Sequence, residues 1–357
     1  MAELTSTPSR SSGARLPRIA LLAGDPNGIG PEMLVKLVDR VRGTIDARLL
    51  LVASAAALQA GGAVAQRRIE PPSIGLAPVS PGGGLPRPLD AWARADGARG
   101  DLAWLEMADP HAADIEPGQM TAKAGLHVLD SLALAARLAR EHLVDGVVFA
   151  PLNKGAMRLA GLVAEDEMRH LQQLLGVDDF VCEFNVTGEL WTSRVTSHIP
   201  LAKVASAIDE RGVRDAIAII DRYLRATGMA APRIAVAGLN PHAGDGGTMG
   251  DEEIRIIGPA VKRMQAEGID ARGPLPADTI FVAARRGDFD AVVSMYHDQG
   301  QIAMKLLGFD SGVTVLGGLP VPFTTCASGT AFDIVGRGVA NIEGLAHALD
   351  INRRMIG

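Results

Sequence analysis

The sequence predicts an α/β protein whose sheet is mostly parallel. Short, continuous apolar segments such as RIALLAG (18–24) and ARLLLVAS (47–54) are typical of buried parallel strands. Segments of helical composition, about ten or more residues long, separate such strands along the chain. Apolar residues make up 47% and charged residues 21%, which is ordinary for a globular protein.

The N-terminal part begins with the strand at 18–24. A helix is predicted from about Pro31, because proline is favoured in the first helical turn. The strand at 47–54 follows, and then the helical segment ALQAGGAVAQ. Residues 71–100 are rich in proline and glycine, so we expect them to form an excursion on the surface.

A long helix rich in alanine and leucine is predicted over 121–143, and it leads into a strand over 145–151. The remaining predicted elements are strands at 181–186, 191–197, 233–239 and 291–296, and helices near 168–175, 210–226 and 251–267. We find no internal repeat in the sequence.

The domain organisation is less clearly marked. Residues 1–17 are polar and lack the apolar stretch of a secretory signal, so we expect a disordered leader. No flexible linker divides 18–357, which predicts one unit with two lobes that share the sheet. We place one lobe at about 18–150 plus 310–357, and the other at 151–309.

The bulk numbers exclude some classes of partner. A net charge of -6 and an aromatic content of 4% give neither the basic face nor the stacking platform of a nucleic-acid-binding protein. The sequence contains no run of about eighteen apolar residues, so it predicts no membrane span. We therefore expect a cytoplasmic protein that acts on a small molecule.

Three histidines follow predicted strands, in turns that contain glycine or proline. They lie in VTSHIPL (His198), GLNPHAGDGG (His242) and MYHDQG (His297). Loops at the carboxyl ends of parallel strands lie at one edge of a sheet, so the three imidazoles are expected to converge. A single histidine is more often structural, but three in equivalent places favour a catalytic metal site. Asp298, next to His297, is a candidate catalytic residue.

Two features leave alternatives open. GDPNGIGPE (24–32) is either a tight structural turn or an anion-binding turn at a helix N-terminus, and the usual nucleotide-binding motifs are absent.

Lys154 directly follows a predicted strand, which favours a functional lysine. Lys305 lies among apolar residues, where desolvation would lower its pKa towards acid–base use. The alternative for Lys305 is a stem that covers apolar surface while the amino group stays in water.

Seven motifs follow one another along the chain: GDPNGIGPE, APLNKGAM, VTSHIPL, GLNPHAGDGG, GPLPADTIF, YHDQG and SGTAFDIVGRGVAN. In this order they resemble the 4-hydroxythreonine-4-phosphate dehydrogenase family of vitamin B6 biosynthesis, from about residue 18 to the C-terminus. That family is similar in fold to the isocitrate and isopropylmalate dehydrogenases. The resemblance implies two α/β/α domains, a homodimer, and an active site in the cleft that the partner subunit completes.

The resemblance also implies roles for single residues. The metal ligands of the family fall on His198, His242 and His297, one of them expected from the other protomer. Its substrate-contacting lysine falls on Lys305. The last motif is similar to the adenosine-binding loop of the decarboxylating dehydrogenases, which implies contacts with NAD or NADP at Gly329, Thr330, Asp333 and Asn341.

Several positions depart from the family pattern. Where the family has Gly-His-Thr-Glu this chain has AEDEMRH, so that Glu167 and Met168 replace the His-Thr pair. Phe323 replaces a phosphate-binding arginine, and Thr314 replaces an asparagine beside the substrate. These changes remove contacts that suit a phosphate dianion and add a carboxylate that would repel it. Relatives that oxidise aromatic cis-dihydrodiols, such as that of terephthalate, similarly lack the phosphate contacts, and Phe323 would suit such a ring.

Together these observations predict a metal-dependent dehydrogenase that oxidises a hydroxyl of a small acidic substrate with NAD or NADP, with loss of CO₂ if the product is a β-keto acid. Lys305 would orient the substrate, and Lys154 or a metal-bound water would move protons. Three histidines favour Zn²⁺, with Mg²⁺, Mn²⁺ or Co²⁺ as alternatives. The other hypotheses are a cis-dihydrodiol dehydrogenase, an acyl-phosphate transferase of related architecture, and a non-catalytic ligand- or metal-binding protein.

Overall fold

The computed structural model describes residues 15–111, 114–308 and 311–356. The strands are β1 (Arg18–Leu22), β2 (Arg48–Ala53), β3 (Leu102–Glu106), β4 (Gly146–Phe149), β5 (Cys182–Thr187), β6 (Leu190–Arg194), β7 (Arg233–Ala237), β8 (Asp270–Leu275), β9 (Ala291–Ser294), β10 (Val313–Gly317) and β11 (Phe323–Cys326). In these residues the strands form one sheet, in the order β3-β2-β1-β4-β11-β10-β5-β6-β9-β7-β8.

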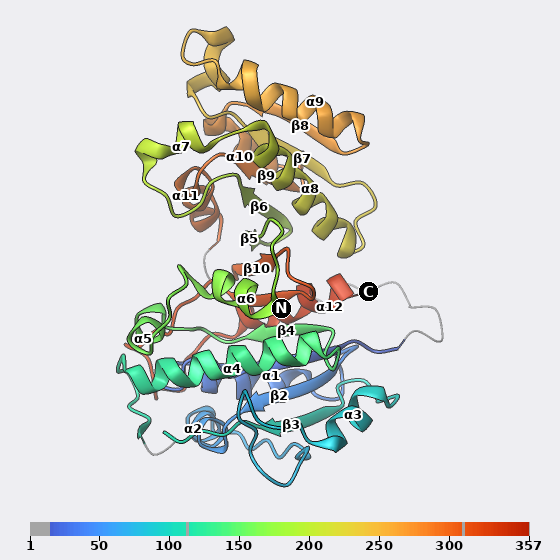
Figure 1. Cartoon of the computed structure of the whole chain (residues 1–357), viewed down its shortest axis with the longest axis vertical. Coiled ribbons are helices and arrows are strands. Elements are labelled where there is room, and N and C mark those ends of the chain that lie inside the picture. The colour runs from blue at the N-terminus through green and yellow to red at the C-terminus, as the bar shows by residue number, and fades with distance from the viewer. Residues whose placement is uncertain (1–14, 112–113, 309–310, 357) are drawn as a thin grey trace.

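Helices lie on both faces of this sheet (Figure 1). They are α1 (Gly30–Val41), α2 (Ala55–Ala65), α3 (Arg87–Arg94), α4 (Ala122–Arg140), α5 (Lys154–Leu159), α6 (Glu167–Leu175), α7 (Leu201–Ala207), α8 (Glu210–Ala226), α9 (Gly258–Ala266), α10 (Ala277–Arg285), α11 (His297–Leu307) and α12 (Glu343–Ile356). None of the helices in the described ranges is long and apolar enough to cross a membrane.

The predicted α/β class with a mostly parallel sheet is confirmed. Strands β1 to β4 and β11 pair in parallel on one side, and β6 to β9 pair in parallel on the other. The antiparallel pairs are confined to the middle, where β10 pairs with β11 and with β5, and β5 pairs with β6. Two parallel halves are therefore joined through a short antiparallel centre, and the division of the chain into two lobes stays a prediction.

The two faces of the sheet are covered differently. On one face a single hydrophobic core includes side chains of α1, α8, α9 and α12. On the other face the core is divided, with one part under α3, α4 and α6 and another under α10 and α11. The break falls at β5, because Glu183, Asn185 and Thr187 are polar and belong to neither part. A sheet face that is polar at its centre leaves room for a site.

Some expected boundaries differ from the structure. Residues 71–100 are not only a surface excursion, because they contain α3, whose Leu89 and Ala93 are buried in the core. Most of the expected leader, residues 1–14, lies outside the described residues. The end of the expected leader is described and is part of the fold, since Pro17 is buried and its carbonyl accepts a hydrogen bond from the Arg48 N–H at 2.8 Å.

Asn352 on α12 joins this helix to the centre of the sheet. It is fully buried, and its Nδ2 lies 3.0 Å from the carbonyl oxygens of Val147 and Pro322. We expect Asn352→Ala to lower the free energy of unfolding by about 1–3 kcal/mol, because it leaves buried acceptors without their donor. Urea denaturation would measure this, with the exposed Gln173→Ala as a control. An unchanged midpoint would show that α12 is held by apolar contacts alone.

Candidate active site

The strands that carry the three predicted histidines are neighbours in the sheet. His198 follows β6, His297 follows β9 and His242 follows β7, and these strands lie side by side in the order β6-β9-β7. All three are parallel, so their carboxyl ends share one edge. The expectation that the histidines stand at one edge of the sheet therefore agrees with the topology.

Hydrogen bonds between the chain segments beyond β6 and β9 bring His198 and His297 together. The N–H of Val195 donates to the Ser294 carbonyl at 2.9 Å, and the Thr196 hydroxyl donates to the Met295 carbonyl at 2.8 Å. The two imidazole rings then lie with their centroids 5.4 Å apart. Nδ1 of His297 lies 2.7 Å from the Asp298 carboxylate, a contact that orients the ring and leaves Nε2 for a ligand.

His242 lies apart from this pair. It occupies the exposed segment Pro241–Gly247, where the backbone is left-handed at five successive residues from His242 to Gly246. Such a run is costly for residues with a side chain. The buried Glu253 stabilises it by accepting hydrogen bonds from the N–H groups of Leu239 and Asn240, both at 2.7 Å. In the described part of the chain, His242 belongs to no group of three possible metal ligands within 4.8 Å of one another.

The close group of possible ligands is Glu165, Asp166 and His198, whose ligand atoms lie within 4.8 Å of one another. Nδ1 of His198 is 3.2 Å from Glu165 and 3.6 Å from Asp166, and the Asp166 carboxylate raises the pKa of His198. With the His297 ring adjacent, the site offers imidazole nitrogens and carboxylate oxygens. This donor set fits a divalent ion such as Zn²⁺ or Mn²⁺.

Lys154 and Glu167 form an ion pair next to this group. Asn153 caps α5 by accepting a hydrogen bond from the Ala156 N–H, and this places Lys154 in the first turn. Its Nζ lies 3.1 Å from Oε2 of Glu167. Burial on its own would lower the pKa of Lys154, but the Glu167 carboxylate outweighs it and raises this pKa. Glu167 is thus compensated by Lys154 and is not a free negative charge facing the substrate.

A cavity of about 180 Å³ opens at the break in the hydrophobic core. His297, Lys305 and Thr314, three of the predicted site residues, line it. Lys305 is exposed on α11, so the burial required by the acid–base hypothesis is absent and the alternative, an amino group in water, agrees with the structure. Lys305 therefore lies where it can meet an anionic group of a ligand in the cavity.

Glu183, Asn185 and Arg194 are further candidate site residues, which we did not predict from the sequence. Glu183 and Asn185 line the same cavity. Arg194, only 5% exposed, makes an ion pair with Glu183 and donates to Oδ1 of Asn185 at 2.9 Å. The signal was present in CEFNVT (182–187), because polar residues that alternate with apolar ones indicate a strand with one face outside the hydrophobic core.

Two predicted substrate contacts lie in the hydrophobic core instead. Phe323 is fully buried on β11, and Met168 is 6% exposed on α6. Both belong to the part of the core under α4. Their apolar side chains pack where the α/β layers meet, so neither presents a surface to a ligand. The argument that Phe323 suits an aromatic substrate therefore loses its basis.

The predicted cofactor loop, SGTAFDIVGRGVAN (328–341), packs against the GDPNGIGPE turn and against Asn153, which precedes Lys154. The Thr330 carbonyl accepts a hydrogen bond from the Ile29 N–H at 3.1 Å, and Nδ2 of Asn153 lies 3.5 Å from the Thr330 hydroxyl. Gly329 and Asp333 are exposed. Asn341 is exposed too, although its Oδ1 accepts from the Glu343 N–H at the start of α12. Ala327, just before the loop, lines the cavity, so the loop and the cavity are continuous.

The GDPNGIGPE segment is a structural turn. The N–H groups of Asp25, Gly28 and Ile29 donate to the carbonyls of Pro151, Asp25 and Thr330, and the Asn27 N–H donates to the Asp25 carboxylate. These donors are thus occupied within the protein rather than free for an anion. The close approach of Gly28 to Thr330, where an added Cβ would lie 2.9 Å from the threonine Cβ, explains the glycine.

Asp25 within this turn is fully buried, and its Oδ2 has no hydrogen-bond partner. Burial raises the pKa of Asp25 from 3.8 to about 6, against the hydrogen bond from Asn27 and the charge of His127. A raised carboxyl pKa contributes stability below pH 3.8 that is lost as the pH rises through about 6. This loss corresponds to at most about 3 kcal/mol.

We therefore expect Asp25→Asn to gain stability relative to the unmodified chain as the pH rises. The amide keeps the acceptor for the Asn27 N–H but never ionises. The difference in the free energy of unfolding should grow by about 1–2 kcal/mol between pH 5 and pH 8. Denaturant unfolding at several pH values would measure it, with Asp288→Asn at an exposed position as control. A difference that stays constant would mean that Asp25 is not neutralised by burial.

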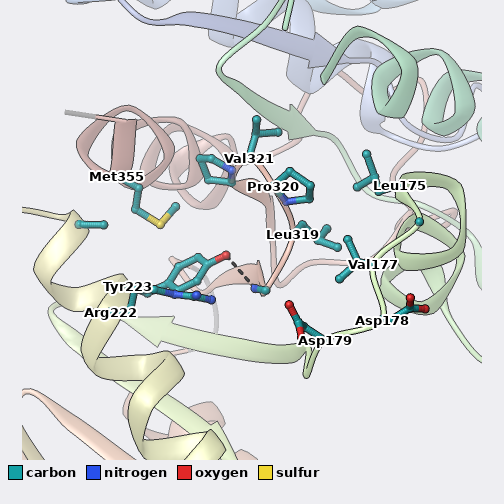
Figure 2. A pocket seen from close by; sticks show the side chains of 14 residues that line it. Leu175, Val177, Asp178, Asp179, Arg222, Tyr223, Leu319, Pro320, Val321 and Met355 are labelled. Carbon is teal, nitrogen blue, oxygen red and sulfur yellow. Dashed lines mark hydrogen bonds between the residues drawn. The ribbon is translucent and has the colours of Figure 1, made fainter. Parts of the chain in front are cut away.

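A larger cavity, of about 850 Å³, lies elsewhere (Figure 2). It is lined by Arg222 and Tyr223 of α8 and by the segment after β10, where the Gly318 N–H donates to the Tyr223 hydroxyl at 2.8 Å. This cavity is at the end of β10, whereas the cavity beside His297 is at its start. It contains none of the predicted site residues, so its size alone does not mark the active site.

Comparison with known proteins identifies the family of this chain. A family model described as "Pyridoxal phosphate biosynthetic protein PdxA" matches residues 50–352. A Pseudomonas aeruginosa protein named provisionally as 4-hydroxythreonine-4-phosphate dehydrogenase 2 is 43% identical over 348 residues, which cover 95% of this chain and 97% of the relative. The D-threonate 4-phosphate dehydrogenase of Bordetella bronchiseptica is 37% identical over 344 residues, or 94% of this chain and 92% of the relative.

Solved structures give the same result. The 4-hydroxythreonine-4-phosphate dehydrogenase of Klebsiella pneumoniae, 34% identical, superposes with a TM-score of 0.77 over 97% of this chain and 99% of that one. A terephthalate 1,2-cis-dihydrodiol dehydrogenase of Burkholderia xenovorans, 28% identical, reaches 0.64 over 93% and 96%. A phosphotransacetylase of Staphylococcus aureus, 14% identical with a TM-score of 0.53 over 95% and 94%, shares the fold alone.

Proposed function

Since this chain belongs to the family of the pyridoxal phosphate biosynthetic protein PdxA and is an NAD(P)-dependent dehydrogenase of that family, we propose that it oxidises a hydroxyl group of a small phosphorylated hydroxy acid with the help of a divalent metal ion. The observation that carries the proposal is the convergence of His198 and His297 beside a cavity lined by Lys305. The two histidines, as proposed metal ligands, and Lys305, as the proposed anion-binding group, then lie around the same small cavity.

The metal ion would be held by His198 and His297, with the third imidazole supplied by His242 of a second copy of the chain. Two facts support the shared site. His198 and His297 are in contact within one chain, whereas His242 stands apart from them on an exposed segment. When bound, the ion would lower the pKa of the substrate hydroxyl and stabilise negative charge on its oxygen.

Lys305 would bind the phosphate or carboxylate of the substrate, because its exposed amino group lies at the cavity. Lys154 would serve as a proton donor, because the ion pair with Glu167 raises its pKa despite burial and keeps the amino group charged. Asp298 would orient His297 through the contact at Nδ1 rather than act on the substrate. Thr314, beside Asn185 at the cavity, would add a hydroxyl contact.

The nicotinamide cofactor, which accepts the hydride, would lie along Gly329, Thr330, Asp333 and Asn341. The loop's position supports this, because it is continuous with the cavity through Ala327 and touches Asn153 next to Lys154. Thr330 is buried against the GDPNGIGPE turn and would fix the loop, while the exposed Asp333 would face the cofactor.

A phosphorylated substrate is favoured over an aromatic dihydrodiol for two reasons. Glu167 is paired with Lys154, so it does not repel a phosphate as a free carboxylate would. Phe323 is buried and offers no aromatic surface. The lysine at the cavity remains available for an anion.

The test is a dehydrogenase assay of the purified chain, stripped of metal and then supplied with Zn²⁺, Mn²⁺, Mg²⁺ or Co²⁺ and with NAD or NADP. Phosphorylated four-carbon hydroxy acids and cis-dihydrodiol dicarboxylates serve as alternative substrates. We expect metal-dependent reduction of the cofactor with the phosphorylated acids. Turnover of the dihydrodiol alone, or equal activity of the stripped and supplied protein, would contradict the proposal.

A further inference from the structure

Glu183 and Asn185 line the cavity beside His297, and we call these two residues its floor. On the cavity face of the sheet, Glu183 of β5 is paired with Arg194 of β6, and their side chains are 19% and 5% exposed. Burying two charges is tolerated when they neutralise one another and their remaining groups are bonded. Arg194 meets this condition, because it also donates to Asn185 Oδ1 at 2.9 Å and to the Ser197 hydroxyl at 3.0 Å.

The remaining hydrogen-bonding capacity of this floor can be counted. Oε2 of Glu183 is used by Arg194, while Oε1 has no partner among the described residues and belongs to a side chain that lines the cavity. Oδ1 of Asn185 is used twice, by Arg194 and by Gln301. Its Nδ2 has only a long contact of 3.5 Å with Thr314. The floor therefore presents one free acceptor and one nearly free donor side by side.

The charge of the floor limits what can bind to that acceptor. Glu183 is already paired with Arg194, and Lys305 adds a cation to the wall of the cavity itself. A substrate ammonium placed at Glu183 would lose its water without gaining an uncompensated counter-charge, and it would share the cavity with the cation of Lys305. A hydroxyl group, which donates one hydrogen bond and accepts another, matches the acceptor of Glu183 and the donor of Asn185 without this cost.

We infer that Glu183, held by Arg194, is a specificity-determining residue that receives a substrate hydroxyl, so that the chain prefers a 2-hydroxy acid to the corresponding 2-amino acid. The inference rests on the proposed function and narrows its substrate class. The relatives divide along this line, since 4-hydroxythreonine carries an amino group at the carbon where threonate carries a hydroxyl.

The test compares kcat/KM for the 2-hydroxy and the 2-amino form of a 4-phosphorylated four-carbon acid, matched in configuration, with the full chain, metal and cofactor present. We expect the unmodified chain to prefer the hydroxy form by about tenfold or more. Glu183→Gln should lower kcat/KM for the hydroxy form by about tenfold and leave the amino form nearly unchanged, because a charge-assisted hydrogen bond becomes a neutral one. The ratio of kcat/KM for the hydroxy form to that for the amino form would therefore fall.

Arg194→Met gives an independent check, because it frees the charge of Glu183 and should raise kcat/KM for the amino form relative to the hydroxy form. The matched control is Glu189→Gln, which makes the same change at an exposed site in the turn between β5 and β6. The inference would be overturned if Glu183→Gln increased the ratio of kcat/KM for the hydroxy form to that for the amino form, or if the unmodified chain preferred the amino form. Either result would leave the proposed function intact. Oxidation of neither form would refute both.

Discussion

Replacing His297 with alanine is expected to lower kcat/KM by at least about a hundredfold and to reduce the metal content of the purified protein. The expectation follows from position, because His297 is at once the neighbour of His198 and part of the cavity wall. Residues that only orient a metal ligand already cost about 10–100-fold when they are replaced, so loss of a ligand itself should cost more. Elemental analysis and steady-state kinetics would measure the two effects together.

The control for this variant is His142→Asn, which changes an exposed histidine at a positive φ that asparagine tolerates. It should keep both metal and activity. Excess metal ion in the assay should partly restore His297→Ala if the loss is one of affinity. Full activity at normal metal content in His297→Ala would remove His297 from the metal site and with it the proposed arrangement.

Replacing Lys305 with alanine is expected to lower kcat/KM by about ten- to a hundredfold, mainly through a higher KM. A hydrogen bond to a charged group is worth about 1.5–3 kcal/mol, and each 1.4 kcal/mol is a factor of ten. Lys305 contributes a charged group at the cavity without being buried, so its loss should not affect folding. Steady-state kinetics and thermal denaturation would separate the two effects.

The matched control is Lys262→Ala, an exposed lysine on α9, which should not alter the kinetics. Lys305→Arg should retain part of the activity, because the charge remains while its geometry changes. A fall in kcat with no change in KM would contradict the binding role and assign Lys305 to the chemical step instead.

The fold was predictable where strands are continuous apolar runs. RIALLAG and ARLLLVAS became β1 and β2, and DGVVFAP became β4. Strands β3, β8, β10 and β11 were not recognised. β8 (DARGPL) carries charged residues and a proline, and β11 (FTTC) is too short to show a period. In the antiparallel centre of the sheet, the pairing of β10 with β5 joins segments more than a hundred residues apart, which no local pattern encodes.

The histidines of the candidate site were predictable because strand ends are visible in a sequence, and β6, β9 and β7 each deliver one. Glu183 and Arg194 were missed because their role depends on which face of β5 and β6 is left uncovered. Phe323 and Met168 were misplaced for the converse reason, since the side on which a strand or helix residue packs is decided by its neighbours in space. Resemblance assigns positions, but not the direction of a side chain.

The pairing of β11 with β4 has a consequence for folding while the chain is being synthesised. β4 has β1 on one side and β11 on the other, yet the Thr325 hydroxyl that bonds the Phe149 carbonyl lies 176 residues further along the chain. During synthesis the early strands emerge with one edge of β4 bare until residues 323–326 leave the ribosome. A bare strand edge invites pairing with other chains. The last strand to be made thus shields one of the first, and a ribosome that stalls late would release an aggregation-prone fragment.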